Sequence, residues 1–144
     1  MSGYTHKLSF SADHPSADLS ELPVKLGMSP KRLWKVGEPR VAPNGRVIGG
    51  NHRSSYCSIE FESSPEGLPT SLRMSVEKLS QHKQLLDEFS KVGVNFRFFI
   101  GWFSEFNSED RLDWQLLSSI AALKISLDFD FYGPQETQQI EIAP

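Results

Sequence analysis

The stretch from Val94 to Gly133, VNFRFFIGWFSEFNSEDRLDWQLLSSIAALKISLDFDFYG, decides the fold class. It begins with an aromatic run at 95–103, continues through a polar loop, and then spaces its apolar residues as an amphipathic helix does. A second alternating run closes the stretch before the glycine. The order strand, loop, helix, strand predicts helices packed on a sheet.

The apolar positions of this stretch identify a candidate core. In the run 95–103 every second side chain is apolar, so one face of the strand is expected to pack inward. Phe99 lies on the opposite face, which suggests that both faces of the strand are covered. Asp113 is a candidate N-cap for the helix that follows. The side chains expected to be buried are Phe98, Ile100, Leu123, Phe129 and Phe131.

Three strands are expected earlier in the chain, because apolar and polar residues alternate over 6–12, 32–37 and 56–62. The segment 38–55 joins the last two of these strands and contains the turn sequence Pro43-Asn44-Gly45. It is predicted to be a long hairpin connection or a mobile loop, and loops of such length are usually functional or disordered.

Two helices are expected in the same part of the chain. Asp18 or Ser20 is a candidate cap for a short helix that ends at Gly27. After a break at 65–69, helical spacing predicts one long helix from Ser75, its candidate cap, to Gly93.

These elements predict one α+β domain over 1–144, with an ordered core at about 5–133 and a polar C-terminal tail at 134–144. Its sheet is expected to be mainly antiparallel or mixed, with about five or six strands and two to three helices packed on it. The segments 8–36 and 96–131 both run strand, acidic turn, helix, strand, which fits a split βαβ pseudo-repeat.

Composition and charge favour an ordinary globular protein. The net charge is −3, with no apolar run long enough for a transmembrane helix and no signal-peptide pattern at the N-terminus. A single cysteine, Cys57, excludes an internal disulfide, so a cytoplasmic location is expected. The segment 25–53 holds seven Lys or Arg and one Glu, a balance of +6, which leaves −9 for the rest. Such asymmetry often steers an acidic partner, although solvated charges on a sheet would look the same.

No residue pattern indicates an enzyme. The four histidines are scattered, and no nucleophile and base stand at a recognisable spacing. Asp128 and Asp130 share one face of a predicted strand, but no third ligand accompanies them, and an ion pair to Arg97 is the simpler interpretation. No metal and no cofactor are therefore expected.

The candidate binding residues lie in and beside the basic segment. Trp34 can stack on a planar or anionic ligand, or it can pack in the core. Arg40, Arg46 and Arg53 can pair with carboxylates or phosphates. The alternative is the acidic surface of the loop after the aromatic strand, formed by Glu105, Glu109 and Asp110.

Two segments carry a family resemblance. They are LGMSP at 26–30 with WKVGEPR at 34–40, and GWF at 101–103 with the helix that leads to LDFDFY at 127–132. Together they resemble a bacterial family of small uncharacterised proteins, a domain of unknown function of the 4279 type, over about 7–133. The resemblance implies no activity or catalytic residue.

Two classes of function remain. The first is a non-catalytic protein-binding module whose partner is another protein, with an immunity-type neutralising role as its sharpest form by analogy. The second is binding of a small anionic ligand or a nucleic acid through the 25–53 segment, and the net negative charge makes nucleic acid the weaker partner. Membrane binding is not expected, and the sequence does not fix an oligomeric state.

Overall fold

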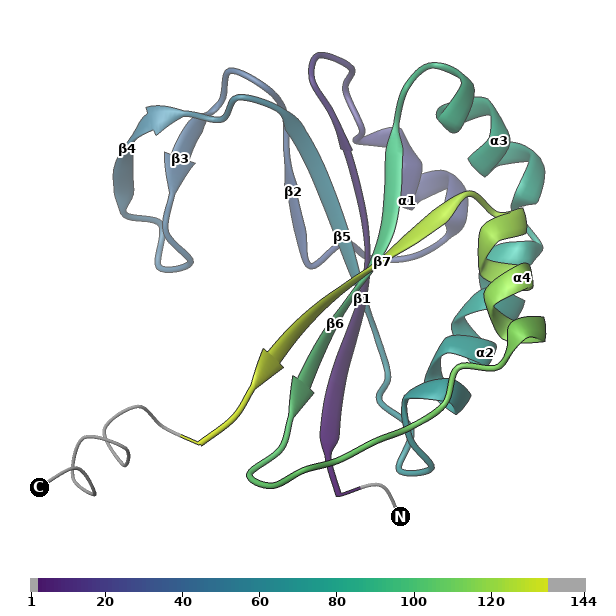
Figure 1. The fold of residues 1–144 in the computed structure, drawn as a ribbon. Helices are drawn as coiled ribbons and strands as arrows, with labels where there is room; N and C mark the ends of the chain where they lie inside the picture. The colour runs from purple at the N-terminus through teal and green to yellow at the C-terminus, as the bar shows by residue number, and fades with distance from the viewer. Residues whose placement is uncertain (1–2, 135–144) are drawn as a thin grey trace, which may run out of the picture.

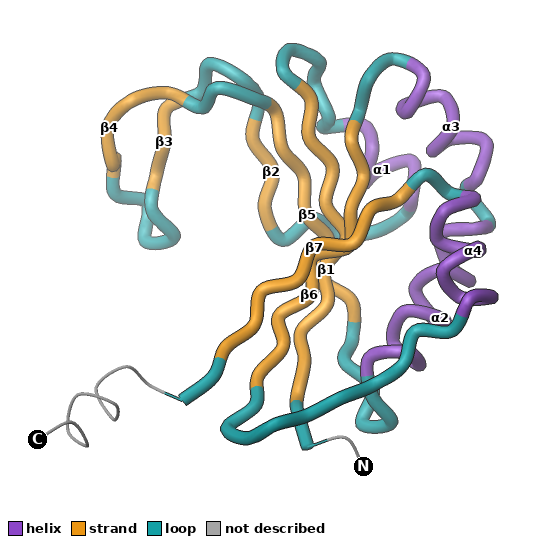
Figure 2. Tube along the Cα trace, in the orientation of Figure 1, coloured by secondary structure: helices purple, strands orange, loops and turns teal. Residues whose placement is uncertain are grey.

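The computed structural model describes residues 3–134, which fold as an α+β structure with a five-stranded sheet, a two-stranded sheet and four helices (Figure 1). The elements along the chain are β1 (Thr5–His14), α1 (Glu21–Leu26), β2 (Arg32–Trp34), β3 (Pro39–Val41), β4 (Val47–Asn51), β5 (Ser55–Phe61), α2 (Leu68–Ser80), α3 (Lys83–Lys91), β6 (Asn95–Phe103), α4 (Trp114–Ala122) and β7 (Ile125–Tyr132). All four helices lie on one side of the large sheet, and its other side carries no helix from the described part of the chain (Figure 2).

The large sheet is mixed, with strand order β2-β5-β1-β6-β7. The central strand β1 is antiparallel to both of its neighbours, β5 and β6, and β7 is parallel to β6. Since β1 and β2 are each antiparallel to β5, they run parallel to one another with β5 between them, which is a split βαβ unit. The second unit, β6-α4-β7, joins adjacent strands, so the two halves echo one another without being equivalent.

The core lies between the sheet and the helices. Leu8 and Phe10 on β1 face the same side as Phe98 and Ile100 on β6, and all four side chains are buried. This confirms the prediction for Phe98 and Ile100, and Leu123 at the end of α4 is buried as well. Helices contribute the other half of this core: Leu19, Leu22 and Leu26 around α1, Leu68, Leu72, Val76 and Leu79 on α2, Leu86 on α3, and Leu116 and Ile120 on α4.

The prediction that Phe129 and Phe131 are buried is wrong. Their side chains are 38% and 66% exposed, whereas Ile125 at the start of the same strand is buried. β7 begins beside α4 and then runs away from the helical layer (Figure 1). The twist of the sheet carries the second half of this edge strand beyond the helices, so alternation there marks an uncovered face.

The helix predicted from Ser75 to Gly93 is two helices. α2 already begins at Leu68 and tolerates Pro69 because a residue in the first turn needs no N–H partner. Ser75 does not cap a helix but lies inside α2, where its hydroxyl donates to the carbonyl of Ser71 at 2.8 Å. The helical conformation is interrupted at 81–82, and α3 begins at Lys83.

The remaining caps are partly as predicted. Asp113 caps α4 through a hydrogen bond from the Leu116 N–H at 2.8 Å, and this bond lowers the pKa of its carboxyl. Gly27 ends α1 in the left-handed conformation, with φ of 69°. Ser20 is the N-cap residue of α1, but its side chain makes no capping hydrogen bond. The Asp18 carboxylate accepts the N–H of Ser20, which precedes the helix, so it does not cap a helical N–H either.

Candidate functional site

The connection between β2 and β5 forms a β-hairpin, which we call the β3–β4 hairpin (residues 38–52). Its tip follows the predicted turn: the Gly45 N–H donates to the Ala42 carbonyl at 2.8 Å, and the Ala42 N–H donates to the Arg46 carbonyl at 2.7 Å. Pro43 suits the first corner, and Gly45 takes φ of 85°, which only glycine adopts at no steric cost. The hairpin alternative for 38–55 is therefore the observed one.

The β3–β4 hairpin projects from the sheet on the side opposite the helices (Figure 1). Every residue of β3 and β4 is exposed, including three apolar ones. Val41 is 52% exposed, Val47 66% and Ile48 56%. The hairpin thus carries branched aliphatic side chains that the described part of the chain does not cover.

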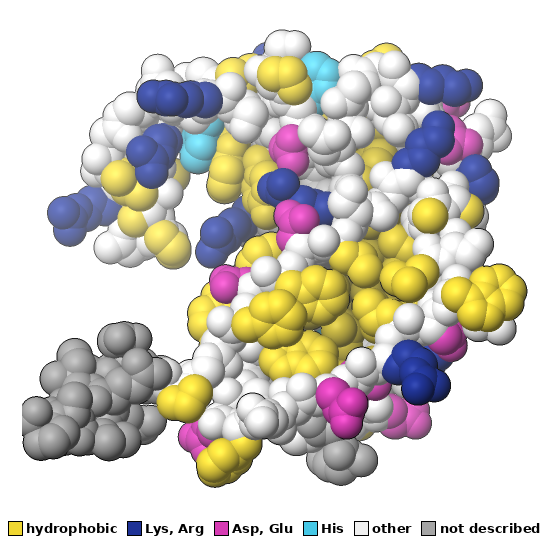
Figure 3. Space-filling view, in the orientation of Figure 1, with side chains coloured by type: hydrophobic (Ala, Val, Ile, Leu, Met, Phe, Trp, Pro, Cys, Tyr) yellow, Lys and Arg dark blue, Asp and Glu magenta, His cyan; other side chains and the backbone are white. Residues whose placement is uncertain are grey.

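Arg40, Arg46 and Arg53 are all exposed on or beside this hairpin. None of them forms an ion pair with a carboxylate of residues 3–134. Lys and Arg side chains stand out on the hairpin in the space-filling view (Figure 3). The structure therefore places the three predicted arginines on or directly beside one projecting element, without an ion pair to the described residues.

Trp34 occupies the base of the hairpin and is half-buried. Its indole stacks on the His52 ring at 4.1 Å between centroids and on the Tyr56 ring at 4.7 Å. His52 belongs to the hairpin and Tyr56 to β5, so Trp34 links the hairpin to the large sheet. These two stacking contacts join the base of the hairpin to β5.

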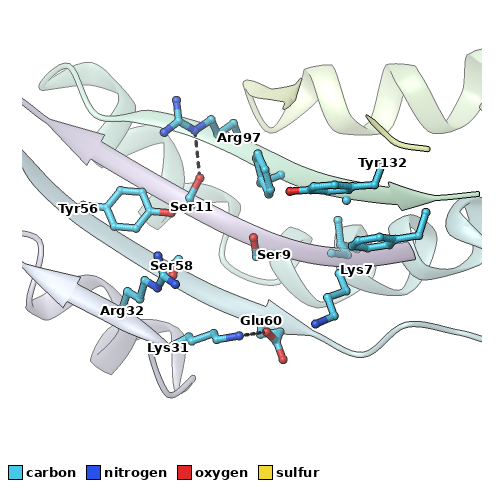
Figure 4. Close-up of a pocket in the computed structure, with 14 residues that line it drawn as sticks. Lys7, Ser9, Ser11, Lys31, Arg32, Tyr56, Ser58, Glu60, Arg97 and Tyr132 are labelled. Atoms are coloured by element: carbon cyan, nitrogen blue, oxygen red, sulfur yellow. Dashed lines mark hydrogen bonds and ion pairs between the residues drawn. The ribbon is translucent and has the colours of Figure 1, made fainter. Parts of the chain in front are cut away.

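A second surface lies on the helix-free side of the large sheet, where a depression of about 610 Å³ is open to solvent (Figure 4). We call it the sheet hollow. Its floor consists of short polar side chains, and rings and charged groups stand around them. The hollow is lined by Ser9, Ser11 and Ser58 on the floor, by Tyr56, Phe99, Phe103 and Tyr132 as rings, and by Lys7, Lys31, Arg32, Glu60 and Arg97 as charged groups.

The charged groups of the sheet hollow fall into paired and unpaired ones. Lys31 bonds Glu60 at 2.5 Å, and this contact lowers the pKa of the Glu60 carboxyl. Arg97 lies 3.4 Å from an Asp13 oxygen and 3.5 Å from an Asp128 oxygen. Lys7 and Arg32 form no ion pair with any residue in 3–134. Sequence reasoning missed this surface; the polar alternation of Ser9 and Ser11 along β1 was its one signal.

The residues of the predicted acidic surface, Glu105, Glu109 and Asp110, are all exposed. The Asp110 carboxylate also accepts the Tyr4 hydroxyl at 2.5 Å and the Arg111 N–H at 2.8 Å. This loop borders a depression of about 530 Å³ that also includes Phe129 and Phe131. The yellow cluster near the centre of Figure 3 shows that aromatic side chains are accessible on this face.

Asp128 and Asp130 contact different partners. Asp128 contacts Arg97, as the ion-pair interpretation expected, whereas Asp130 accepts the Tyr132 hydroxyl at 2.5 Å and raises the pKa of that phenol. Within residues 3–134 no three His, Cys, Asp or Glu side chains gather where they could hold a metal ion. The same part of the chain contains no helix suited in length and hydropathy to cross a membrane.

One serine–histidine contact was not visible from sequence. The His6 Nε2 lies 2.8 Å from the Ser71 hydroxyl, which also accepts the Ser64 N–H at 2.8 Å. Burial lowers the pKa of His6, and the Asp110 charge opposes that shift only in part. Ser71 is 1% exposed, so no substrate reaches its hydroxyl. Cys57 is equally buried, and burial raises the pKa of its thiol to about 11, so neither group is an available nucleophile.

Comparison with known proteins identifies the family. The model of a family described as a domain of unknown function (DUF4279) matches residues 4–134, nearly the whole chain. The chain therefore belongs to this family, in agreement with the resemblance found in the sequence. No curated protein and no solved structure matches it.

Proposed function

We propose that this member of the DUF4279 family is a non-catalytic protein-binding module and that the β3–β4 hairpin is the element that contacts the partner. One observation carries the proposal. The hairpin exposes Val41, Val47 and Ile48 beside three arginines that have no carboxylate partner in residues 3–134.

The composition of the hairpin supports a protein partner. A two-stranded hairpin gains little stability alone, and this one is linked to the large sheet at its base, where Trp34 stacks on His52 and Tyr56. Hydrogen bonds from the Gly37 N–H to the His52 carbonyl and from the His52 N–H to the Glu38 carbonyl join its two arms there. Exposed aliphatic residues lose unfavourable hydration when a partner covers them. Arginine is enriched at interface centres, whereas a phosphate backbone offers nothing for valine and isoleucine to contact.

The charges define the partner surface. A complementary partner surface would carry carboxylates that pair with Arg40, Arg46 and Arg53. These carboxylates would surround an apolar strip that packs against the valines and the isoleucine of the hairpin. An immunity-type role is the sharpest form of this proposal, in which the partner is a toxin with such an acidic surface.

The test is binding to a purified partner, identified by capture with the wild-type chain, at low and high salt. The combined change Arg40→Ala, Arg46→Ala and Arg53→Ala should weaken affinity at least tenfold at low salt and flatten its salt dependence. The matched control is Arg111→Ala, an exposed arginine outside the hairpin, which should bind as the wild type does. Melting temperatures of both variants should stay within about 2 °C, because exposed charges contribute little to folding.

Two results would contradict the proposal. One is a triple variant that binds with wild-type affinity at low salt, which would make the hairpin a passive connection and direct attention to Glu105 and Glu109. The other is competition for the hairpin by single-stranded oligonucleotides, which would assign the arginines to phosphate binding.

A further inference from the structure

We propose that the sheet hollow is a binding site for a small molecule that joins a planar ring to an anionic group. This site is separate from the β3–β4 hairpin and does not depend on the protein-binding function. Its residues come from five strands, β2, β5, β1, β6 and β7, which the sheet register places side by side.

The register explains why this face is hollowed. Ser9 of β1 lies opposite Glu60 of β5 and Phe99 of β6, and Ser11 lies opposite Ser58 and Arg97. Three short side chains, Ser9, Ser11 and Ser58, therefore lie together among the longer Glu60, Arg97 and Phe99 (Figure 4). Gly101 leaves room for the neighbouring Phe103 ring, which would lie only 3.1 Å from a Cβ at this position. The resulting volume, about 610 Å³, is within the usual range of small-molecule sites.

The ring of a ligand would stack on Phe99. This side chain is 40% exposed on β6, an interior strand of the sheet, where a large aromatic is normally covered. The neighbouring rings already have partners in the described part of the chain: Phe103 stacks on Tyr132 at 4.7 Å, and Tyr56 stacks on Trp34. Phe99 makes no ring–ring contact with a residue in 3–134, so its face is available.

The anionic group would bind Arg32, with Lys7 as the second cation. The other two cations of the sheet hollow are neutralised, Lys31 by Glu60 and Arg97 by Asp13 and Asp128. Arg32 lies opposite Ser58 in the sheet register. The Ser58 side chain makes no hydrogen bond to a residue in 3–134, so its hydroxyl can add a bond to the same anion. A guanidinium fork and a hydroxyl together suit a phosphate or a carboxylate.

The test is a titration of the isotope-labelled full chain, followed by amide resonances, with three probes. These are adenosine monophosphate, which has ring and anion, adenosine, which has the ring alone, and inorganic phosphate. We expect saturable binding of the monophosphate, with shifts at Ser9, Ser58 and Phe99, and affinities for the other two probes that are at least tenfold weaker, since each lacks one recognised group. Benzoate and phenyl phosphate then distinguish a carboxylate ligand from a phosphate ligand.

Variants separate recognition from folding. Arg32→Ala and Phe99→Leu should each raise the dissociation constant of the monophosphate about tenfold, while melting temperatures show that both variants fold. The matched controls are Arg111→Ala and Phe106→Ala, exposed residues outside the sheet hollow, which should leave binding unchanged.

Three results would overturn the inference. They are the lack of saturation by any probe up to about 10 mM, equal binding of the monophosphate and inorganic phosphate, and unchanged binding by Arg32→Ala. Affinity for oligothymidylate that rises steadily with length would instead assign the face to single-stranded nucleic acid. None of these results bears on the hairpin arginines, so the protein-binding proposal is tested independently.

Discussion

Truncation of Phe98 and of Phe129 to alanine should give clearly different losses of stability, although both residues lie on the apolar face of adjacent parallel strands. Phe98 is fully buried, beside Phe10 at 5.9 Å between ring centroids. Removal of its ring leaves a cavity, and such changes cost about 3–5 kcal/mol. Phe129 pairs with Ile100 across the sheet but keeps 38% of its surface in water. Phe129→Ala should therefore lose roughly three fifths of the free energy of burying a whole aromatic side chain, which is about 1–2 kcal/mol, and the cavity cost at the surface should be small.

Urea denaturation followed by circular dichroism measures both values, with the slope of the transition checked for constancy. Phe98→Ala should shift the midpoint by at least twice as much as Phe129→Ala. Equal losses of about 3–5 kcal/mol would show that the second half of β7 is packed against the helices, and the uncovered face inferred from the sheet twist would then be wrong. Phe131→Ala, at a residue that is 66% exposed, should cost less than either and provides an internal control.

Three further results are expected. Because burial lowers the pKa of His6, the unfolded chain binds a proton on this side chain more readily than the folded chain does. The contribution of His6 to stability should therefore be constant above its ordinary pKa of 6.5 and decline as the pH falls below that value. In melts from pH 7.5 to 5, His6→Gln should remove this part of the acid sensitivity. Cys57, whose thiol pKa is raised to about 11, should react with a thiol reagent at pH 8 only as fast as the fold opens, and a rapid reaction of the native chain would contradict its burial. Gly27→Ala should cost about 1 kcal/mol in the same urea assay, because alanine must adopt a φ of 69° although nothing obstructs its methyl group; an unchanged midpoint would show that the cap adjusts freely.

Local signals in the sequence were sufficient for several elements. The aromatic strand was predicted at 95–103, and β6 has the same bounds. Asp113 and Gly27 mark helix ends because their side-chain and backbone preferences act within one turn. Pro43-Asn44-Gly45 formed the expected turn for the same reason. In each of these cases the residues that decide the structure lie within a few positions of one another.

The errors arose where tertiary packing decides. Alternation through Phe129 and Phe131 defines a strand face, but whether a helix covers that face depends on the twist of the sheet and the length of α4. Helical spacing continues through 81–82, so it could not show that α2 and α3 are separate helices. Ser75 looked like a cap because an isolated serine before an apolar repeat has the same pattern as one inside a helix.

The candidate sites show the same division between local and distant information. The exposure of Arg40, Arg46 and Arg53 could be expected from the turn residues around them, since a long polar connection lies at the surface. The sheet hollow could not be expected from the sequence, because its residues range from Lys7 to Tyr132 and are brought together by the register of five strands. The register also divides the basic segment 25–53: Lys31 and Arg32 line the sheet hollow, whereas Arg40 and Arg46 lie on the hairpin and Arg53 directly follows it. A charge excess that is continuous in sequence is thus divided between two surfaces in the fold, so each proposed site needs its own variants and its own probe.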